Sequence, residues 1–296
     1  MCCDQRHACY NEPPMSRHKA RLFLALTALL WSSSGLLVKV TSWQPLSIFG
    51  ARSLIASLVF MVYLRQFSFR WTRWQIGGAL GYAVAQLLFI TATKLTTAAN
   101  VIFLQYTAPI YIVLFGYWVL RERPQRSDWV AMPVIFAGLL LFFGDELSLD
   151  GLTGNVLAII SGMALATMML CMRAQKDGVP AQTMLLGSLL GTIIGLPFSF
   201  QETWTPTDVG IILYLGTFQI GIASLFYSTA IKYVPALEAT LILTLEPVLN
   251  PIWVFLVLGE TPGPLALLGG TLVLAAIAAR AISGAQRQIE PSTTPP

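Results

Sequence analysis

Residues 85–124 read AQLLFITATKLTTAANVIFLQYTAPIYIVLFGYWVLRERP, and residues 223–262 read ASLFYSTAIKYVPALEATLILTLEPVLNPIWVFLVLGETP. Placed one above the other without gaps, so that Ala85 pairs with Ala223, the two stretches are identical at ten of forty positions. Composition alone would give about three identities. The identical pairs include Lys94 with Lys232 and two pairs of prolines. We therefore predict that the chain contains two related halves.

Apolar residues make up 55% of the 296 residues and charged residues only 11%, against the ~25% charge usual for soluble domains. A helix of about 20 apolar residues crosses the ~30 Å core of a bilayer. Ten continuous apolar runs follow one another, at 21–41, 45–64, 74–93, 97–120, 127–144, 152–172, 181–200, 207–230, 235–258 and 264–283. Continuous rather than alternating runs exclude membrane β-strands. The sequence predicts an all-α polytopic membrane protein with ten transmembrane helices.

Each half contains five of these runs, the first half over 21–144 and the second over 152–283. Because five is odd, the second half is predicted to enter the membrane upside down relative to the first. Inverted repeats are a recurring plan of secondary transporters, with the substrate site near the midplane between them. We expect residues 1–20 and 284–296 to form disordered tails. Met15, which directly precedes a basic flank, is an alternative translation start.

The basic residues predict the orientation of the chain in the membrane. With a cytoplasmic N-terminus, fifteen of the 18 Lys and Arg residues fall in cytoplasmic segments. The positive-inside rule therefore predicts that both termini are cytoplasmic, in the cell membrane. This distribution also explains the net charge of +4, and no basic stripe interleaved with aromatic residues indicates nucleic-acid binding. The expected partners are the lipid bilayer and a small-molecule substrate, and homo-oligomer formation stays open.

Few residues in the chain could carry enzyme chemistry. Both histidines, His7 and His18, lie in the N-terminal tail, so no imidazole is expected inside the membrane. The nucleotide-binding motif G-x-x-x-x-G-K-[ST] and the zinc motif H-E-x-x-H are absent. We expect no metal, no cofactor and no catalytic residue, and we do not predict an enzyme.

Several stretches are shared with a known family of membrane proteins. They are Trp31-Ser-Ser-Ser-Gly35 followed by Lys39, Pro45 and Arg52; Pro109 with Leu120-Arg-Glu-Arg-Pro124; Leu245-Glu-Pro-Val248 with Leu258-Gly-Glu-Thr-Pro262; and the glycines Gly138, Gly269 and Gly270 of the helices that follow. Over about residues 20–283 the chain resembles the drug/metabolite transporter superfamily, EamA type. The resemblance implies ten helices around a central cavity and transport, often export, of small metabolites. Members of the superfamily carry amino acids, sugars, nucleotides or xenobiotics.

Glu246 is the most informative single residue for function. It lies about 16 Å along its predicted helix and so near the bilayer midplane. A carboxylate there costs about 2.5–3.5 kcal/mol on insertion scales and is expected to face a cavity or a partner. Asn250 lies one turn further on the same face. Because burial favours a neutral carboxyl group, Glu246 is also a candidate proton carrier. Alternatively, it bonds backbone groups freed by Pro247 and Pro251.

Other polar and aromatic side chains inside the predicted helices are candidates to line the substrate path. They are Trp31, Ser34, Tyr82, Gln86, Gln105, Tyr106, Gln219 and Tyr227. Amides and aromatic rings suit small amphipathic solutes, whereas the alternative for each is a hydrogen bond to a neighbouring helix.

Two prolines and one arginine inside the predicted helices have two interpretations each. Pro109 and Pro247 occupy equivalent positions and are candidate gating residues, because proline bends a helix; a static kink is the alternative. For Arg52 we favour snorkelling or bonding to loop carbonyls over binding of an anionic substrate.

Taken together, these features predict a secondary transporter of a small organic metabolite, such as an amino acid or a drug-like solute. Alternating access at the interface of the two repeats would carry the solute across the cytoplasmic membrane, with export the expected direction. The alternative is a membrane receptor or scaffold that uses the same fold without transport.

Overall fold

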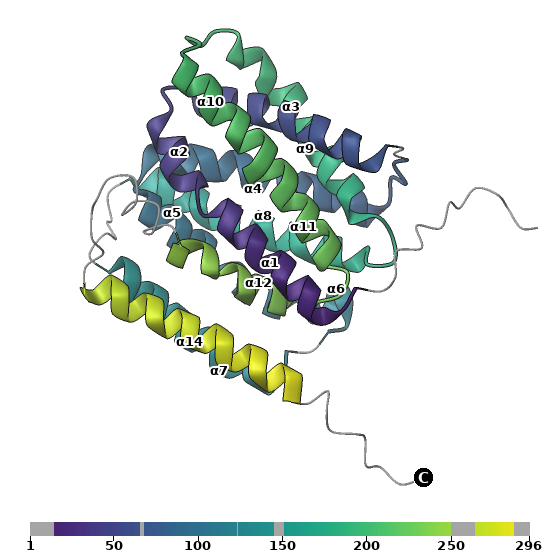
Figure 1. Ribbon diagram of the computed structural model, residues 1–296, viewed down its shortest axis with the longest axis vertical. Coiled ribbons are helices and arrows are strands. Elements are labelled where there is room, and N and C mark those ends of the chain that lie inside the picture. Colours follow the sequence, from purple (N-terminus) through teal and green to yellow (C-terminus); the bar gives the residue numbers. More distant parts are fainter. Residues whose placement is uncertain (1–14, 66–67, 123, 145–150, 250–263, 287–296) are drawn as a thin grey trace, which may run out of the picture.

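The computed structural model describes residues 15–65, 68–122, 124–144, 151–249 and 264–286. Every regular element within these ranges is a helix (Figure 1). Helix α1 begins at Arg17 and α14 ends at Gln286, so both extend a few residues into the predicted tails. The rest of the two tails, the alternative start that would remove residues 1–14, and the candidate residue Asn250 lie outside the described residues.

The first half of the chain forms seven helical pieces. They are α1 (Arg17–Trp31), α2 (Ser34–Val40), α3 (Pro45–Leu64), α4 (Arg73–Leu95), α5 (Ala98–Gln105), α6 (Ala108–Leu120) and α7 (Arg126–Phe143). Two interruptions divide what the sequence predicts as single spans: one follows Trp31, and the other follows Gln105. At each, a hydroxyl side chain bonds a backbone carbonyl three residues back, Ser33 to Leu30 and Thr107 to Leu104.

The second half repeats this order. Its helices are α8 (Leu152–Ala174), α9 (Pro180–Ser199), α10 (Pro206–Tyr214), the π-helix η1 (Leu215–Ile222), α11 (Ala223–Ala230), α12 (Ala236–Leu243) and α14 (Pro264–Gln286). Residues 245–249 are also helical, after a turn at Thr244. Among the described residues, seven helices are long and apolar enough to cross a membrane. The predicted helical membrane protein is confirmed, whereas the predicted count of ten spans is not.

The lengths of the helices align the two halves more completely than the sequence does. Helices α3 and α9 each contain 20 residues, and helices α5 and α12 each contain 8 residues. Helices α2 and α8 end at corresponding positions, Val40 and Ala174. Pairing α5 with α12 residue by residue places the interruption at Tyr106 on the turn at Thr244. The halves therefore share one backbone plan, including its irregularities.

The helices of each half pack mainly against helices of the other half. Helix α3 lies along α9, α4 along α8 and α9, and α7 along α14, while α1 packs against α11 and α12 (Figure 1). Small residues allow the closest of these contacts: a Cβ added to Gly50 on α3 would lie 2.0 Å from the backbone carbon of Gly195 on α9. Such small-residue contacts are typical of helix association in membranes.

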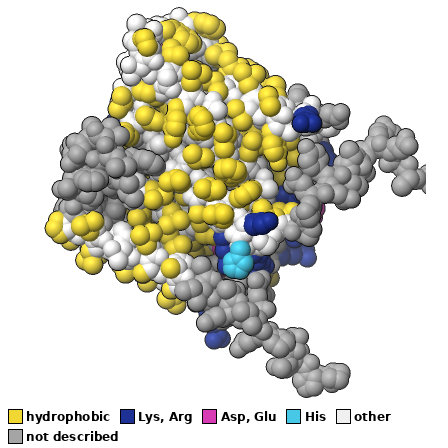
Figure 2. Space-filling view, in the orientation of Figure 1, with side chains coloured by type: hydrophobic (Ala, Val, Ile, Leu, Met, Phe, Trp, Pro, Cys, Tyr) yellow, Lys and Arg dark blue, Asp and Glu magenta, His cyan; other side chains and the backbone are white. Residues whose placement is uncertain are grey.

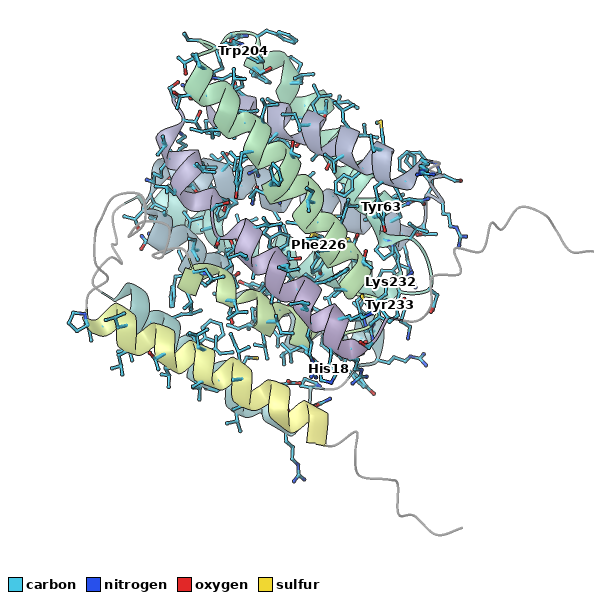
Figure 3. All side chains as sticks on the ribbon, in the orientation of Figure 1. His18, Tyr63, Trp204, Phe226, Lys232 and Tyr233 are labelled. Carbon is cyan, nitrogen blue, oxygen red and sulfur yellow. The ribbon has the colours of Figure 1, made fainter. Side chains whose placement is uncertain are left out.

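The outer surface is apolar, and its two ends differ in charge. Figure 2 shows a broad hydrophobic face, with Lys and Arg gathered toward the end where α1 begins. That end carries His18 and Lys232, and the opposite end carries Trp204 (Figure 3). We call them the His18 end and the Trp204 end. An apolar belt between polar ends fits a bilayer.

Candidate substrate site

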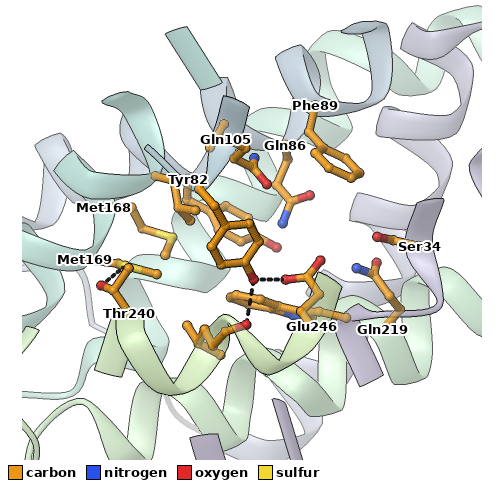
Figure 4. Close-up of a pocket in the computed structure, with 15 residues that line it drawn as sticks. Ser34, Tyr82, Gln86, Phe89, Gln105, Met168, Met169, Gln219, Thr240 and Glu246 are labelled. Atoms are coloured by element: carbon orange, nitrogen blue, oxygen red, sulfur yellow. Dashed lines mark hydrogen bonds between the residues drawn. The ribbon is translucent and has the colours of Figure 1, made fainter. Parts of the chain in front are cut away.

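A polar pocket lies between the two halves, beside the interruptions of the helices (Figure 4). Its walls come from α1, α2, α4 and α5 of the first half and from α8, η1, α12 and residues 245–249 of the second half. Trp31 and Ser34 flank the first interruption, Tyr106 lies at the second, and Leu243 precedes the turn at Thr244. Irregular backbone at membrane depth is tolerated where it lines a cavity. The interruptions therefore supply the pocket with polar groups.

Eight of the ten candidate substrate-binding residues line this one pocket: Trp31, Ser34, Tyr82, Gln86, Gln105, Tyr106, Gln219 and Glu246. Tyr227 is fully buried behind them, with its ring centroid 5.9 Å from that of Trp31. That these residues bind a substrate stays a prediction. Sequence reasoning missed the rest of the wall, which is Thr240 and the apolar residues Ala85, Phe89, Leu165, Met168, Met169 and Leu243. In the sequence, such residues cannot be told from those of an ordinary helix-packing core.

Glu246 is buried and hydrogen-bonds Tyr106 across the boundary between the halves. The Tyr106 hydroxyl oxygen lies 2.8 Å from Glu246 Oε2 and 2.6 Å from the Leu243 carbonyl oxygen (Figure 4). A phenol has one hydrogen to donate. The hydroxyl therefore donates to Glu246 or to the Leu243 carbonyl, and either bond ties the first half of the chain to the second.

Gln105 has a structural partner as well as a place in the pocket wall. Its Nε2 donates to Ser161 Oγ on α8 at 2.7 Å, and Ser161 donates to the carbonyl of Ala85 on α4 at 2.9 Å. This chain of bonds joins three helices, as expected for polar side chains that hold membrane helices together. Gln105 therefore makes the interhelical hydrogen bond that was its alternative role, and its contact with a substrate stays a prediction.

The structure corrects our interpretation of Arg52. We favoured snorkelling or bonding to loop carbonyls, but the side chain is 1% exposed in the interior of α3. One guanidinium nitrogen, Nη2, donates to Oε1 of the pocket residue Gln86. The other, Nη1, is buried without a hydrogen-bond partner. The α3 helix cannot release this side chain to the membrane surface because α9 and η1 pack against it.

Further buried polar atoms around the pocket also have no hydrogen-bond partner. They are Trp31 Nε1, Gln219 Oε1, Ser224 Oγ and Tyr227 Oη. Unsatisfied buried polar groups are rare in native proteins, and each calls for a water or a ligand. Gln86, Gln219 and Glu246 point toward the same space in Figure 4. Donors and acceptors from both halves thus face one small volume.

The pocket is narrow in this conformation. The space open to water-sized molecules is only about 40 Å³, which is little more than the ~30 Å³ that one water takes up in the liquid. A solute of amino-acid size does not fit until the walls move apart.

The two halves are joined by ion pairs at the His18 end. Arg21 on α1 pairs with Glu238 on α12 at 2.7 Å. Arg173 on α8 pairs with Glu122, also at 2.7 Å, and donates to the carbonyl oxygen of Lys232. Each pair links one half of the chain to the other.

At the Trp204 end, two of the corresponding contacts lie among the described residues, whereas Glu260, the counterpart of Glu122, lies outside them. Asn100 on α5 donates to Asn155 on α8 at 2.9 Å. These two residues correspond to Glu238 and Arg21 when α5 is paired with α12 and the end of α8 with the end of α2. Lys39 donates to the carbonyl of Thr96. The two ends thus use matching positions with different chemistry.

The candidate gating prolines both follow an interruption. Pro109 is at the start of α6, and Pro247 lies within residues 245–249 after the turn at Thr244. Proline at the beginning of a helix breaks no backbone hydrogen bond. Instead of the kink expected from the sequence, the helix is interrupted just before each of the two prolines.

An apolar exterior around two related helical halves, with a pocket between them that polar, aromatic and apolar side chains line, is the architecture of a membrane transporter. The sequence matches the EamA-like transporter family over residues 18–144 and 152–280, once for each half. The chain belongs to this family, which confirms the resemblance to the drug/metabolite transporter superfamily.

Curated relatives and a solved structure agree with this assignment. The chain is 27% identical over 267 residues to the uncharacterized transporter YwfM of Bacillus subtilis, covering 86% of this chain and 90% of the relative. It is 25% identical over 239 residues to the threonine/homoserine exporter RhtA of Escherichia coli, covering 76% and 78%. A crystal structure of a protein with 18% identity shares the fold, with a TM-score of 0.77 over 90% of this chain and all of that chain.

Proposed function

We propose that this protein is a secondary transporter that exports a small amino-acid-like solute from the cell by alternating access. The observation that carries the proposal is the pocket between the halves, which collects eight polar or aromatic candidate residues beside matching breaks of the helices. Transporters of inverted-repeat design bind their substrates at such breaks. Residues 21–144 and 152–283 form the two five-helix repeats of a ten-helix protein in this proposal.

The opposed positions of equivalent residues support the inverted arrangement. Lys94 donates to the carbonyl of Thr41, and Thr41 bonds Asp208, near Trp204. Its counterpart Lys232 lies at the His18 end (Figure 3). We infer that the His18 end is cytoplasmic, because the basic side chains of the described surface gather there. This orientation puts both termini in the cytoplasm.

The chemical groups that line the pocket, and one relative, support the class of substrate. RhtA, which aligns over most of this chain, is named a threonine/homoserine exporter. The pocket combines amides, hydroxyls and aromatic rings with a single carboxyl group. These groups suit a small zwitterion better than a large cation, and export is the direction we propose.

The ion pairs at the His18 end and the narrow pocket support alternating access. In this conformation two ion pairs join the halves at the proposed cytoplasmic end. Breaking them would let the halves rock apart there, while the Asn100–Asn155 bond at the other end stays formed. We propose that the halves hinge at the helix interruptions that precede Pro109 and Pro247.

Counterflow in proteoliposomes tests this proposal. Vesicles preloaded with L-threonine, L-homoserine, other amino acids, sugars, nucleotides or cationic drugs are diluted into labelled solute, with and without a pH gradient. We expect saturable exchange of small amino acids. A protein that is folded but exchanges none of these solutes would be a receptor or scaffold, and flux without stimulation by solute on the far side would indicate a channel.

Glu246→Gln separates proton coupling from binding in the same assay. The glutamine amide can hydrogen-bond Tyr106 as the carboxyl group does, but it cannot release a proton. We expect the variant to keep counterflow and to lose the part of the flux that a pH gradient drives. If the pH-driven part is unchanged, Glu246 carries no proton.

A further inference from the structure

Arg52 is a buried cation whose charge no acidic residue balances. It is 1% exposed, and none of the carboxylates in the described part of the chain forms an ion pair with it. An unpaired charge in a membrane-spanning helix is costly, and such residues as a rule mark substrate or ion pathways. Packing does not require an arginine here, because an apolar side chain would fill the same space at lower cost.

The guanidinium of Arg52 lies behind the wall of the pocket, where it hydrogen-bonds the wall residue Gln86. Its Nη2 donates to Gln86 Oε1, and Gln86 lines the pocket. Tyr82, which also lines the pocket, is close enough to Arg52 to interact with its charge. The second nitrogen, Nη1, has no partner although it is fully buried. The arginine is therefore oriented by one bond, with a second donor left free.

The planar guanidinium matches a carboxylate. Two parallel N–H groups bind the two oxygens of a carboxylate, which makes Arg the preferred side chain for this anion. The opposite wall offers Glu246 and the free Gln219 Oε1, which are acceptors for an ammonium group. An α-amino acid carries both groups a short distance apart.

We propose that Arg52, positioned by Gln86, binds the carboxylate of an α-amino acid and so makes a free carboxylate a requirement of the substrate. This inference rests on the proposed function, transport of a small amino-acid-like solute through this pocket. The inference assigns recognition of the substrate carboxylate to Arg52. From the sequence alone we had favoured a structural role for this residue.

The test compares an amino acid with its neutral amide. L-threonine and L-threoninamide share size and ammonium group, and they differ in the carboxylate. Half-saturation constants for counterflow are measured for both with the wild type, Arg52→Gln and Arg52→Lys. The matched control is Lys94→Gln, another cation within a membrane helix, which bonds the backbone of Thr41 and lies outside the pocket wall.

We expect the wild type to prefer the acid by about 10-fold to 100-fold, the range that hydrogen bonds to a charged group provide. In Arg52→Gln the ratio should fall to about 1. Arg52→Lys keeps the charge without the planar fork and should be intermediate, and it carries the test if Arg52→Gln does not fold. Lys94→Gln should keep the wild-type ratio.

Two outcomes overturn parts of this assignment in different ways. A wild type that exchanges acid and amide equally well contradicts the role of Arg52 and leaves the proposed transport intact. The same conclusion follows if Arg52→Gln keeps the wild-type ratio and only melts at a lower temperature, because Arg52 is then structural. Exchange of no amino acid by folded wild type defeats the proposed function itself.

Discussion

The broken helix of the first half, α5 with α6, and its counterpart in the second half, α12 with residues 245–249, are interrupted at the same position. They contribute different groups to the pocket. Tyr106 lies at the first interruption and Thr244 at the second. Two residues further along each half, Ala108 of the first half aligns with Glu246 of the second. The backbone plan is shared, and the side chains that face the pocket are not.

At one position that is identical in the two halves, the two threonine side chains make the same structural contact. Thr91 bonds the carbonyl of Leu87 at 2.9 Å, and its counterpart Thr229 bonds that of Leu225 at 2.8 Å. Ala85 is the one member of the ten identical pairs whose side chain lines the pocket among the residues that the structure describes. The two halves therefore share residues that stabilise the helices, whereas most residues that line the pocket differ between the halves.

The largest effect on transport is expected at the two helix interruptions, where Tyr106 of the first half aligns with Thr244 of the second. Tyr106→Phe removes the hydroxyl that bonds Glu246 and Leu243, which leaves a buried carboxyl group without its partner. We expect counterflow to fall about 10-fold to 100-fold. Thr244→Ala, at the matching position, loses only a bond to its own helix and should change counterflow by less than about 3-fold.

A double-mutant cycle sharpens that prediction. In a Glu246→Ala background, Tyr106→Phe should have little further effect, because the two side chains act as one unit. Equal effects of Tyr106→Phe in both backgrounds would mean that Tyr106 acts through packing and not through Glu246.

Seven apolar helices long enough to cross a membrane could be predicted from the sequence, because bilayer thickness fixes their length and charge patterns fix their ends. The same reasoning found most of the polar wall of the pocket, since polar residues in apolar spans have few other places. It could not find Leu165 or Met168, which resemble ordinary core residues. Arg52 is buried because α9 packs closely against α3. The distance between these two helices could not be predicted from the spacing of residues along α3.

A smaller effect is expected from the unlike contacts at the two ends. Glu122→Gln breaks the ion pair with Arg173 at the His18 end, and Asn100→Ala breaks the Asn100–Asn155 bond at the Trp204 end. The Glu122 side chain is 31% exposed, so we expect a loss of less than about 1 kcal/mol in unfolding free energy. The conformational equilibrium should shift by up to about 5-fold, in opposite directions for the two variants.

Labelling of a pocket cysteine from each side of the membrane measures that shift. Glu122→Gln should raise the labelling rate from the cytoplasmic side, and Asn100→Ala from the outer side. Rates that change in the same direction for both variants would mean that these contacts stabilise the fold without selecting between open states.

The smallest effect on stability and transport is expected from the identical pair Thr91 and Thr229. Thr91→Val and Thr229→Val each remove one bond within a helix, and both threonines lie outside the pocket wall. We expect less than about 1 kcal/mol of destabilisation for each, equal to within a few tenths, and unchanged half-saturation constants. Thermal unfolding in detergent provides the comparison. A large difference between the two variants would show that identical residues have diverged in role.

The most direct test of the pocket as the substrate site uses Ser34→Cys in a chain from which the four native cysteines have been replaced. Ser34 lines the pocket, and Thr207→Cys, exposed in the first turn of α10 at the Trp204 end, serves as the control. A membrane-impermeant thiol reagent should label Ser34→Cys from both sides of the membrane, and a saturating transported amino acid should slow this labelling without affecting the labelling of Thr207→Cys. Labelling of Ser34→Cys that is indifferent to every transported solute would contradict a substrate site between the two halves.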